Sequence, residues 1–202
     1  MDRIEANNSI RLCGTPLAAP EYSHSSRGLD FYTFPLRVQR LSGAADTLNI
    51  PLRREQLEAL PGEGALGVCV EGEIRSFNSR RGEGAKLIIT VLAQELSPYP
   101  GEDENRVTLR GTLCKEPKLR VTPMGREICD LMLAVNRHYG RSDYLPCICW
   151  GLTARKAAAW DVGTRLRLEG RMQSRGYIKL TDEGPLHRTA FEISAMDLEL
   201  LE

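Results

Sequence analysis

The sequence predicts an all-β protein in which one barrel architecture occurs twice. Three observations favour this fold class: the same residues recur at a nearly constant spacing, several segments alternate apolar with polar residues, and a proline-containing break interrupts the chain near its middle. The 202 residues are sufficient for two domains of ordinary size. The hydrophobic fraction of 42% is enough to form buried cores.

The repeat emerges when the second half of the chain is shifted by about 97 residues against the first. The same residue types then recur in the same order: Asn8, Gly14, Pro20, Leu36, Val38, Arg40 and Val70-Glu71-Gly72 match Asn105, Gly111, Pro117, Leu133, Val135, Arg137 and Leu168-Glu169-Gly170. Two prolines, a glycine and an acidic run between the copies oppose both helix and strand. We therefore predict an N-terminal domain at 1–97, a linker at 98–104 and a C-terminal domain at 105–202.

Each copy is predicted to form a five-stranded barrel. In the second copy Val107, Leu109 and Leu113 alternate with polar residues, which is typical of a half-buried strand. Further strands are predicted at 131–135, 147–150, 166–172 and 189–198. A helix is predicted at 153–160, after Thr153 as N-cap, and the first copy has residues 53–60 in that place. Five strands with a short helix between the third and the fourth are the layout of the OB-fold, which recurrently binds oligonucleotides.

Charge and motifs narrow the classes of function. The formal net charge is zero, with 27 basic and 27 acidic residues, so a nucleic-acid site must come from the arrangement of charges and not from their total. The sequence lacks the GxxxxGK[ST], HExxH and GxSxG motifs. We therefore expect a binding protein that is not an enzyme and needs no cofactor.

The six cysteines are expected to be buried thiols in a reducing compartment. The close pair Cys147 and Cys149 has no second pair of ligands nearby in the sequence, so we expect no metal site. No apolar run approaches the roughly 20 residues that span a bilayer. The first eight residues do not resemble a secretory signal. The expected location is therefore the cytoplasm.

An ordered set of residues runs from the first to the last predicted strand of the second copy: Asn105-Arg106-Val107, Gly111-Thr112-Leu113, Pro117-Lys118-Leu119-Arg120, Leu133-Ala134-Val135-Asn136-Arg137, Trp150, Glu169-Gly170-Arg171, Gln173, Arg175, Tyr177 and Glu192. Through these residues the second copy closely resembles the bacterial single-stranded DNA-binding protein family. The first copy resembles the family only through the repeat. The resemblance implies sequence-tolerant binding of single-stranded DNA in replication, repair or recombination.

A binder of this kind needs aromatic faces for the bases and cations for the phosphates. The resemblance implies stacking on Tyr139, Tyr144, Trp150 and Tyr177. The basic candidates around them are Arg137, Arg141, Arg171 and Arg175, with Lys115, Lys118 and Arg120 near the first hairpin. Simpler interpretations stay open, because Trp150 could belong to the core, the tyrosines could merely pack in turns, and the arginines could merely face solvent.

The first copy has fewer candidates. The positions aligned with Tyr139 and Trp150 fall near Ser42 and Leu52, and only Phe77 supplies an aromatic side chain near the location of Tyr177. A basic hairpin with Arg75, Arg80, Arg81 and Lys86 either guides the phosphates or is a solvated turn.

Assembly and alternative functions follow from the same resemblance. Single-domain relatives gather four OB-folds, so a chain with two is expected to form a homodimer. The sequence ends at Leu198-Glu199-Leu200-Leu201-Glu202 without the acidic-tipped tail of the family, so recruitment of partners by such a tail is not expected. The alternatives are an OB-fold pair for protein assembly, similar to replication-restart accessory proteins, and an RNA-binding OB-fold protein.

Overall fold

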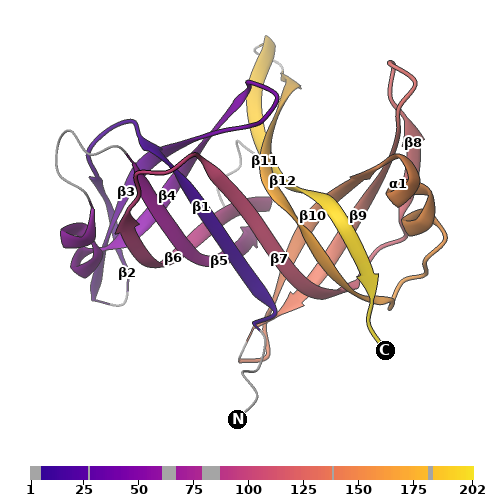
Figure 1. Ribbon diagram of the computed structural model, residues 1–202, viewed down its shortest axis with the longest axis horizontal. Coiled ribbons are helices and arrows are strands. Elements are labelled where there is room, and N and C mark those ends of the chain that lie inside the picture. Colours follow the sequence, from indigo (N-terminus) through magenta and orange to yellow (C-terminus); the bar gives the residue numbers. More distant parts are fainter. Residues whose placement is uncertain (1–5, 27, 61–66, 79–86, 138, 182–183) are drawn as a thin grey trace. The chain divides into compact units, whose positions relative to one another are not determined.

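The computed structural model describes residues 6–26, 28–60, 67–78, 87–137, 139–181 and 184–202, which are mostly β-strands (Figure 1). The first copy contains β1 (Asn8–Pro16), β2 (Glu21–Ser26), β3 (Leu29–Gln39), β4 (Ala45–Arg53), the short 3-10 helix η1 (Arg54–Ala59), β5 (Val68–Asn78) and β6 (Leu87–Pro98). The second contains β7 (Glu104–Leu113), β8 (Lys118–Val121), β9 (Glu127–Asn136), β10 (Ser142–Trp150), the helix α1 (Gly151–Ala158), β11 (Arg165–Thr181) and β12 (Gly184–Leu200). None of the helices within these residues is long and apolar enough to cross a membrane.

The chain divides into two compact units. Ser9–Arg75 and Thr90–Arg106 form the N-terminal unit, and Met1–Asn8, Ser76–Ile89 and Val107–Glu202 form the C-terminal unit. The end of β5 therefore belongs to the unit that holds the second copy.

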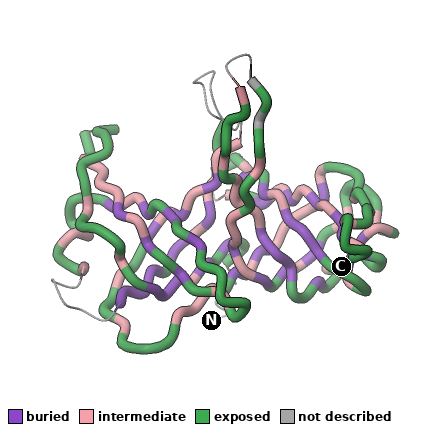
Figure 2. Tube along the Cα trace, turned by 90° about the horizontal axis from the view of Figure 1, so that it is seen from above, coloured by how far each residue is buried: buried purple, intermediate pink, exposed green. Residues whose placement is uncertain are grey.

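Five strands of the C-terminal unit close into a ring. β7 pairs with β9 and β11, β11 pairs with β12, and β9 pairs with β10, all in antiparallel fashion. The parallel pair of β10 and β12 completes the ring, with Cys147 opposite Ile193. Its interior is filled by leucines that are almost fully buried: Leu109, Leu133, Leu145 and Leu168. Figure 2 shows buried residues along these strands, whereas the outer part of the β11–β12 hairpin is largely exposed.

The helix of this unit begins earlier than the sequence predicts. It spans Gly151–Ala158, and Trp150 and not Thr153 is the N-cap residue, without a side-chain capping bond. Gly151 has a φ of 57°, which favours glycine and lets the chain turn directly from β10 into the helix. Two further strand features were missed, since β8 pairs with β9 and the β11–β12 hairpin is much longer than predicted.

The N-terminal unit is arranged around β1 and β3. β1 pairs with β3 and β5, β3 pairs with β2 and β4, and β5 pairs with β6. The segment predicted as a helix forms η1, in which the Gln56 side chain accepts a hydrogen bond from the Arg53 amide at 2.8 Å. The Gln56 amide group also donates to the Ala93 carbonyl at 3.1 Å, which attaches η1 to β6.

The linker residues are hydrogen-bonded within the N-terminal unit. β6 extends to Pro98 and β7 begins at Glu104, so only 99–103 lie outside strands. The Tyr99 amide donates to the Gly67 carbonyl at 3.0 Å, and the Tyr99 hydroxyl donates to the Glu104 carboxylate at 2.5 Å. This hydrogen bond and the nearby Arg11 lower the pKa of Glu104.

Matched glycines of the repeat occupy places where two strands approach closely. A Cβ at Gly72 would lie 2.1 Å from the Leu92 carbonyl oxygen, and one at Gly170 would lie 2.3 Å from that of Ser194. A Cβ at Gly14 would likewise meet the backbone of Arg37, and one at Gly111 that of Ala134. The glycines recur because each copy needs the same backbone approach.

The expectation for the cysteines is wrong for two of them. Cys13 on β1 and Cys69 on β5 are direct cross-strand partners, with a Cα–Cα distance of 4.0 Å, and they form a disulfide. The sequence did not indicate this pairing, because the two cysteines lie 56 residues apart. Cys114, Cys129, Cys147 and Cys149 are free, and burial raises the pKa of each of them, that of Cys149 to about 12. Among the described residues no group of three or more His, Cys, Asp or Glu could hold a metal ion.

The close approach at Gly170 gives a stability prediction. Gly170→Ala should lower the free energy of unfolding by about 1–3 kcal/mol, because the strands must separate to admit the methyl group. Gly176→Ala on the same strand is the matched control, since no heavy atom lies within 4 Å of its added Cβ. Thermal melts should show a clear loss of stability for the first variant only, and equal melting temperatures would contradict the packing argument.

The cysteine assignment predicts a thiol count. Unfolded protein that has not been reduced should react with a thiol reagent at four cysteines, and reduction should raise the count to six. Native protein at pH 8 should react slowly, because the raised pKa values keep the buried thiols protonated. Six reactive thiols before reduction would show that the disulfide is absent.

Candidate nucleic-acid interface

Strand β10 presents two of the predicted aromatic side chains on the same side of its sheet. Leu145, Cys147 and Cys149 are buried in the barrel, so strand alternation places the even-numbered residues on the opposite side. Tyr144 and Trp150 lie there, and their exposed fractions are 51% and 39%. Trp150 is therefore not a core residue. We call this side of the sheet formed by β8, β9, β10, β12 and β11 the outer face.

Cross-strand pairing brings basic candidates close to Trp150 on the outer face. Trp150 pairs with Ile128 of β9, which in turn pairs with Arg120 of β8. The next row of paired residues crosses all five strands: Lys118, Asp130, Ile148, Ser194 and Arg171. Lys118, Arg120, Trp150 and Arg171 thus lie on two adjacent rows of one surface.

The outer face continues along the β11–β12 hairpin. Beyond the register shift between Glu169 and Gly170, strand alternation places Arg171, Arg175 and Tyr177 on the same side of β11. Tyr177 is half-buried and pairs across the hairpin with Arg188. Sequence reasoning missed Arg188 because it started the last strand at residue 189. Thr181 pairs with Gly184 at the end of the hairpin, and the same register places Arg188 opposite Tyr177.

Carboxylates hold two of the candidate arginines in place. The Arg120 guanidinium donates to Asp130 at 2.5 and 3.0 Å, and this hydrogen bond raises the pKa of Arg120. Arg175 lies 3.4 Å from the mostly buried Glu192 carboxylate. Arg171 differs, because its buried Nε has no hydrogen-bond partner in the described part of the chain.

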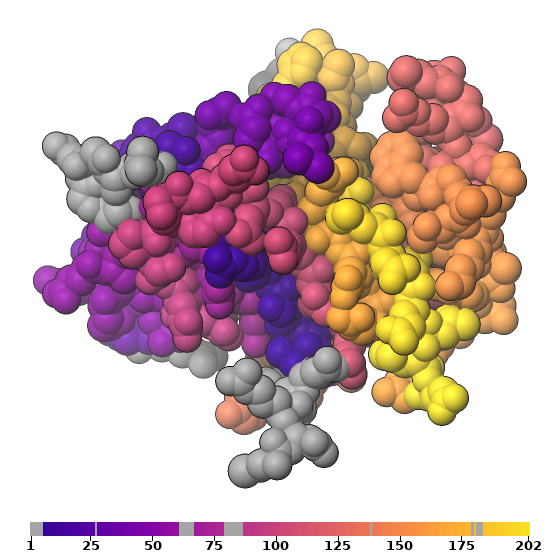
Figure 3. Space-filling model, viewed as in Figure 1, coloured from indigo at the N-terminus to yellow at the C-terminus, as the bar shows by residue number. Residues whose placement is uncertain are grey.

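Two projections flank the outer face. The β8–β9 turn and the β11–β12 hairpin both extend toward the top of the view in Figure 1 and stand apart in the space-filling view (Figure 3). Lys118 is exposed beside the first projection, and Tyr177 lies on the second. Tyr139 and Arg141 lie elsewhere, in the exposed turn between β9 and β10.

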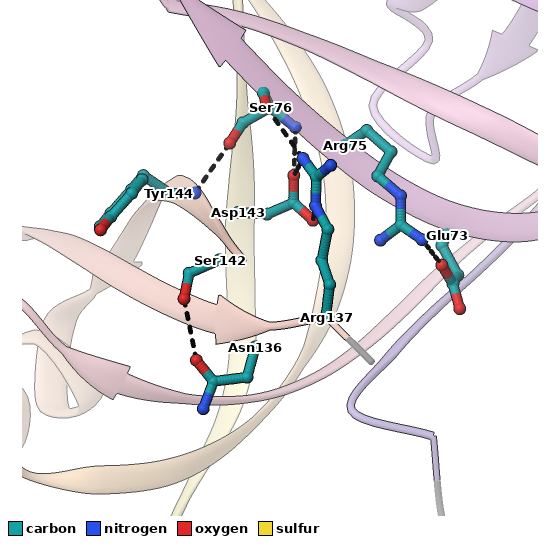
Figure 4. A network of polar contacts seen from close by, with 8 residues as sticks. All are labelled: Glu73, Arg75, Ser76, Asn136, Arg137, Ser142, Asp143 and Tyr144. Carbon is teal, nitrogen blue, oxygen red and sulfur yellow. Dashed lines mark hydrogen bonds and ion pairs between the residues drawn. The ribbon is translucent and has the colours of Figure 1, made fainter. Parts of the chain in front are cut away.

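Arg137 has a structural partner that the sequence interpretation did not anticipate. Its Nε donates to the Asp143 carboxylate at 2.8 Å, its Nη2 bonds the other oxygen, and the same Nη2 donates to the Ser76 carbonyl at 3.2 Å (Figure 4). The side chain of Asp143 is 0% exposed. Removing one partner of such a buried pair typically costs about 3–5 kcal/mol. Arg137 is therefore committed to the fold in this structure, unlike the phosphate contact that the resemblance implies.

The N-terminal unit contains the same fork of charge-assisted hydrogen bonds. Arg40 Nε and Nη2 bond the buried Asp46 carboxylate at 2.7 and 2.5 Å. Aligning the two forks makes Arg53 the counterpart of Trp150 and corrects the earlier alignment to Leu52, which is buried. The corresponding face of β4 carries Thr47, Asn49, Pro51 and Arg53, so it has no aromatic side chain.

Phe77 belongs to the C-terminal unit although it lies within the first copy in sequence, on β5. Its neighbour Ser76 is hydrogen-bonded there, and the Tyr144 amide donates to the Ser76 hydroxyl at 2.7 Å. Phe77 is half exposed, as Tyr144 is. Arg80 and Arg81 lie outside the described residues.

Comparison with known proteins is consistent with this surface. The model of the Single-strand binding protein family matches residues 104–201. The single-stranded DNA-binding protein of Clostridium tetani is 31% identical over 105 residues, which cover 48% of this chain and 70% of that protein. Single-stranded DNA-binding protein 2 of Listeria innocua is 38% identical over 80 residues, 36% of this chain and 50% of that protein.

The structural comparison covers nearly the whole chain. The crystal structure of the wild-type single-stranded DNA binding protein from Thermus aquaticus has a TM-score of 0.78 and 25% sequence identity, covering 96% of this chain and 93% of that one. In sequence, by contrast, the chain spans about half the length of several curated relatives that it matches. The two-thirds coverage of the Clostridium tetani protein and the family match together show that the chain belongs to the single-strand binding protein family.

Proposed function

We propose that this chain binds single-stranded DNA with little regard to sequence and is not an enzyme. The bases stack on aromatic side chains of the outer face, and basic side chains around them contact the phosphates. The observation that carries this proposal is the exposure of Tyr144 and Trp150 on the same face as Lys118 and Arg171.

The chemistry of this face favours single strands over duplex. Stacking on an aromatic side chain is worth about 1–3 kcal/mol per base and is available to every base, since each has a π-face. In a duplex the bases already stack on one another, so Trp150 and Tyr144 have no free face to contact. Arg171 adds a cation on the β11 side of the same surface.

The domain arrangement is part of the proposal. We infer two tandem OB-folds, at 1–97 and 105–202, with 98–104 as the linker. The closed ring of five strands with α1 after β10 supports this for the second copy, and the matched forks and glycines support common ancestry of the two. The names of the relatives support single-stranded DNA as the ligand. We further propose that this binding serves replication, repair or recombination.

Tryptophan fluorescence tests the proposed face directly. Titration with oligo(dT) should quench the emission, with an affinity that falls steeply as salt rises, while duplex of equal length should bind far more weakly. Trp150→Phe should abolish most of the quenching. Trp160→Phe should leave it intact, because Trp160 lies after α1, outside the strands of the outer face, where its ring contacts Lys156.

A parallel titration with oligo(U) compares RNA with DNA as the ligand, and tighter binding of RNA would favour the RNA-binding alternative. Equal competition by duplex and single strand would contradict the stacking proposal. Quenching that depends on Trp160 and not on Trp150 would place the ligand on another surface.

We further propose a homodimer, which would bring together four OB-folds. Light scattering at micromolar concentration should give a mass of about 45 kDa, twice the 22.6 kDa of the chain. A constant mass of one chain over that concentration range would contradict the dimer.

A further inference from the structure

We propose that Phe77 and Tyr144 form one composite base-stacking site, and that Arg137 and Asp143 position it. This inference rests on the proposed binding of single-stranded DNA. It assigns Phe77 to the site of the second copy and makes Arg137 a positioning residue in place of a phosphate contact.

The first step is that every polar group of Ser76 is held. Its amide donates to Asp143 Oδ1 at 2.6 Å, its carbonyl accepts from Arg137 Nη2 at 3.2 Å, and its hydroxyl accepts from the Tyr144 amide at 2.7 Å (Figure 4). The backbone before Phe77 is thereby fixed to Arg137 and to Asp143 and Tyr144 near the start of β10. All of these residues belong to the C-terminal unit.

The second step concerns the two rings. Standard bond lengths place the Cα atoms of Phe77 and Tyr144 within about 10 Å of each other, given the hydrogen bond between Ser76 and Tyr144. Each of the two side chains is 51% exposed, which leaves ring surface for a base. With their Cα atoms this close, the two side chains can each reach a base of one extended strand.

The third step is that the fork around Asp143 resists displacement. The carboxylate is fully buried and accepts from Arg137 and from the Ser76 amide, so moving Ser76 away would leave a buried charge with fewer partners. The N-terminal unit has an equivalent fork between Arg40 and Asp46, which indicates that the fork itself belongs to the fold. In the C-terminal unit it serves a second purpose, because it also fixes the residue that precedes Phe77.

The site is tested by oligo(dT) affinity at one salt concentration. Phe77→Ala and Tyr144→Ala should each weaken binding about fivefold or more, as expected for the loss of one stacked base. Tyr22→Ala, which removes a ring of similar exposure from β2, should bind like wild type. Phe77→Ala with wild-type affinity, alongside a weakened Tyr144→Ala, would overturn the composite site and leave the proposed function standing. If wild type itself fails to bind oligo(dT), the proposed function fails first.

The role of Arg137 is tested by the salt dependence of DNA affinity and by the effect of Phe77→Ala in an Arg137→Gln background. Arg137→Gln should weaken binding with an unchanged slope of log affinity against log salt, whereas loss of a phosphate contact lowers that slope by about 1. In the Arg137→Gln background, Phe77→Ala should cost less than twofold. A reduced slope, or an undiminished effect of Phe77→Ala, would overturn the positioning role.

A reporter variant keeps the test decisive if Arg137→Gln does not fold. Phe77→Trp is made in a chain that also carries Trp150→Phe and Trp160→Phe, so the new indole is the sole tryptophan. Its emission should be quenched by oligo(dT), and that of Tyr22→Trp in the same background should not. Absence of quenching at position 77, with binding intact by a second method, would overturn the proposal.

Discussion

The parallel pairing of β12 with β10 is the constraint on which the candidate interface depends. It closes the five-stranded ring, and it also sets Ser194 beside Ile148, which joins the rows of β8, β9 and β10 to those of β11. Without that register Arg171 would not share a row with Lys118. Gly170 is part of the same constraint, because a side chain there would strike the Ser194 carbonyl and force the two strands apart. The pairing that closes the barrel therefore also assembles the candidate interface.

Two acidic residues on the outer face hold arginine side chains by ion pairs. Asp130 and Glu192 each bond an arginine that the sequence marked as a candidate, Arg120 and Arg175. A held guanidinium loses less conformational entropy when a phosphate arrives than a free one does, although it must share its donors. In a chain of zero net charge, a polyanion site on this face would depend on the placement of its cations and not on their total.

The repeat in the sequence was the most informative feature, because the matched residues are those that the backbone itself requires. Gly72 and Gly170 recur because the facing strand leaves no room for a side chain. Arg40 and Arg137 recur because each bonds a buried aspartate. The resemblance supplied the candidate aromatic residues, and alternation along β10 accounts for the exposure of two of them, Tyr144 and Trp150. The partner of Arg137 could not be foreseen, since a basic residue near aromatics looks the same in sequence whether it faces a phosphate or a buried carboxylate. Cys13 and Cys69, far apart in sequence, are likewise joined only by strand register.

The two copies share the residues that the backbone requires and differ in the side chains that face outward. The fork and the close-approach glycines are present in both, so both retain what is needed to fold. The face of β4 that corresponds to Tyr144 and Trp150 instead carries Thr47 and Arg53, which can contact a phosphate but offer no ring for a base. The first copy nevertheless adds Ser76 and Phe77 to the unit that holds the second. Loss of a stacking face from one domain and supply of a ring to the other unit are compatible outcomes of duplication, because the framework residues constrain the barrel while the outward side chains remain free to change.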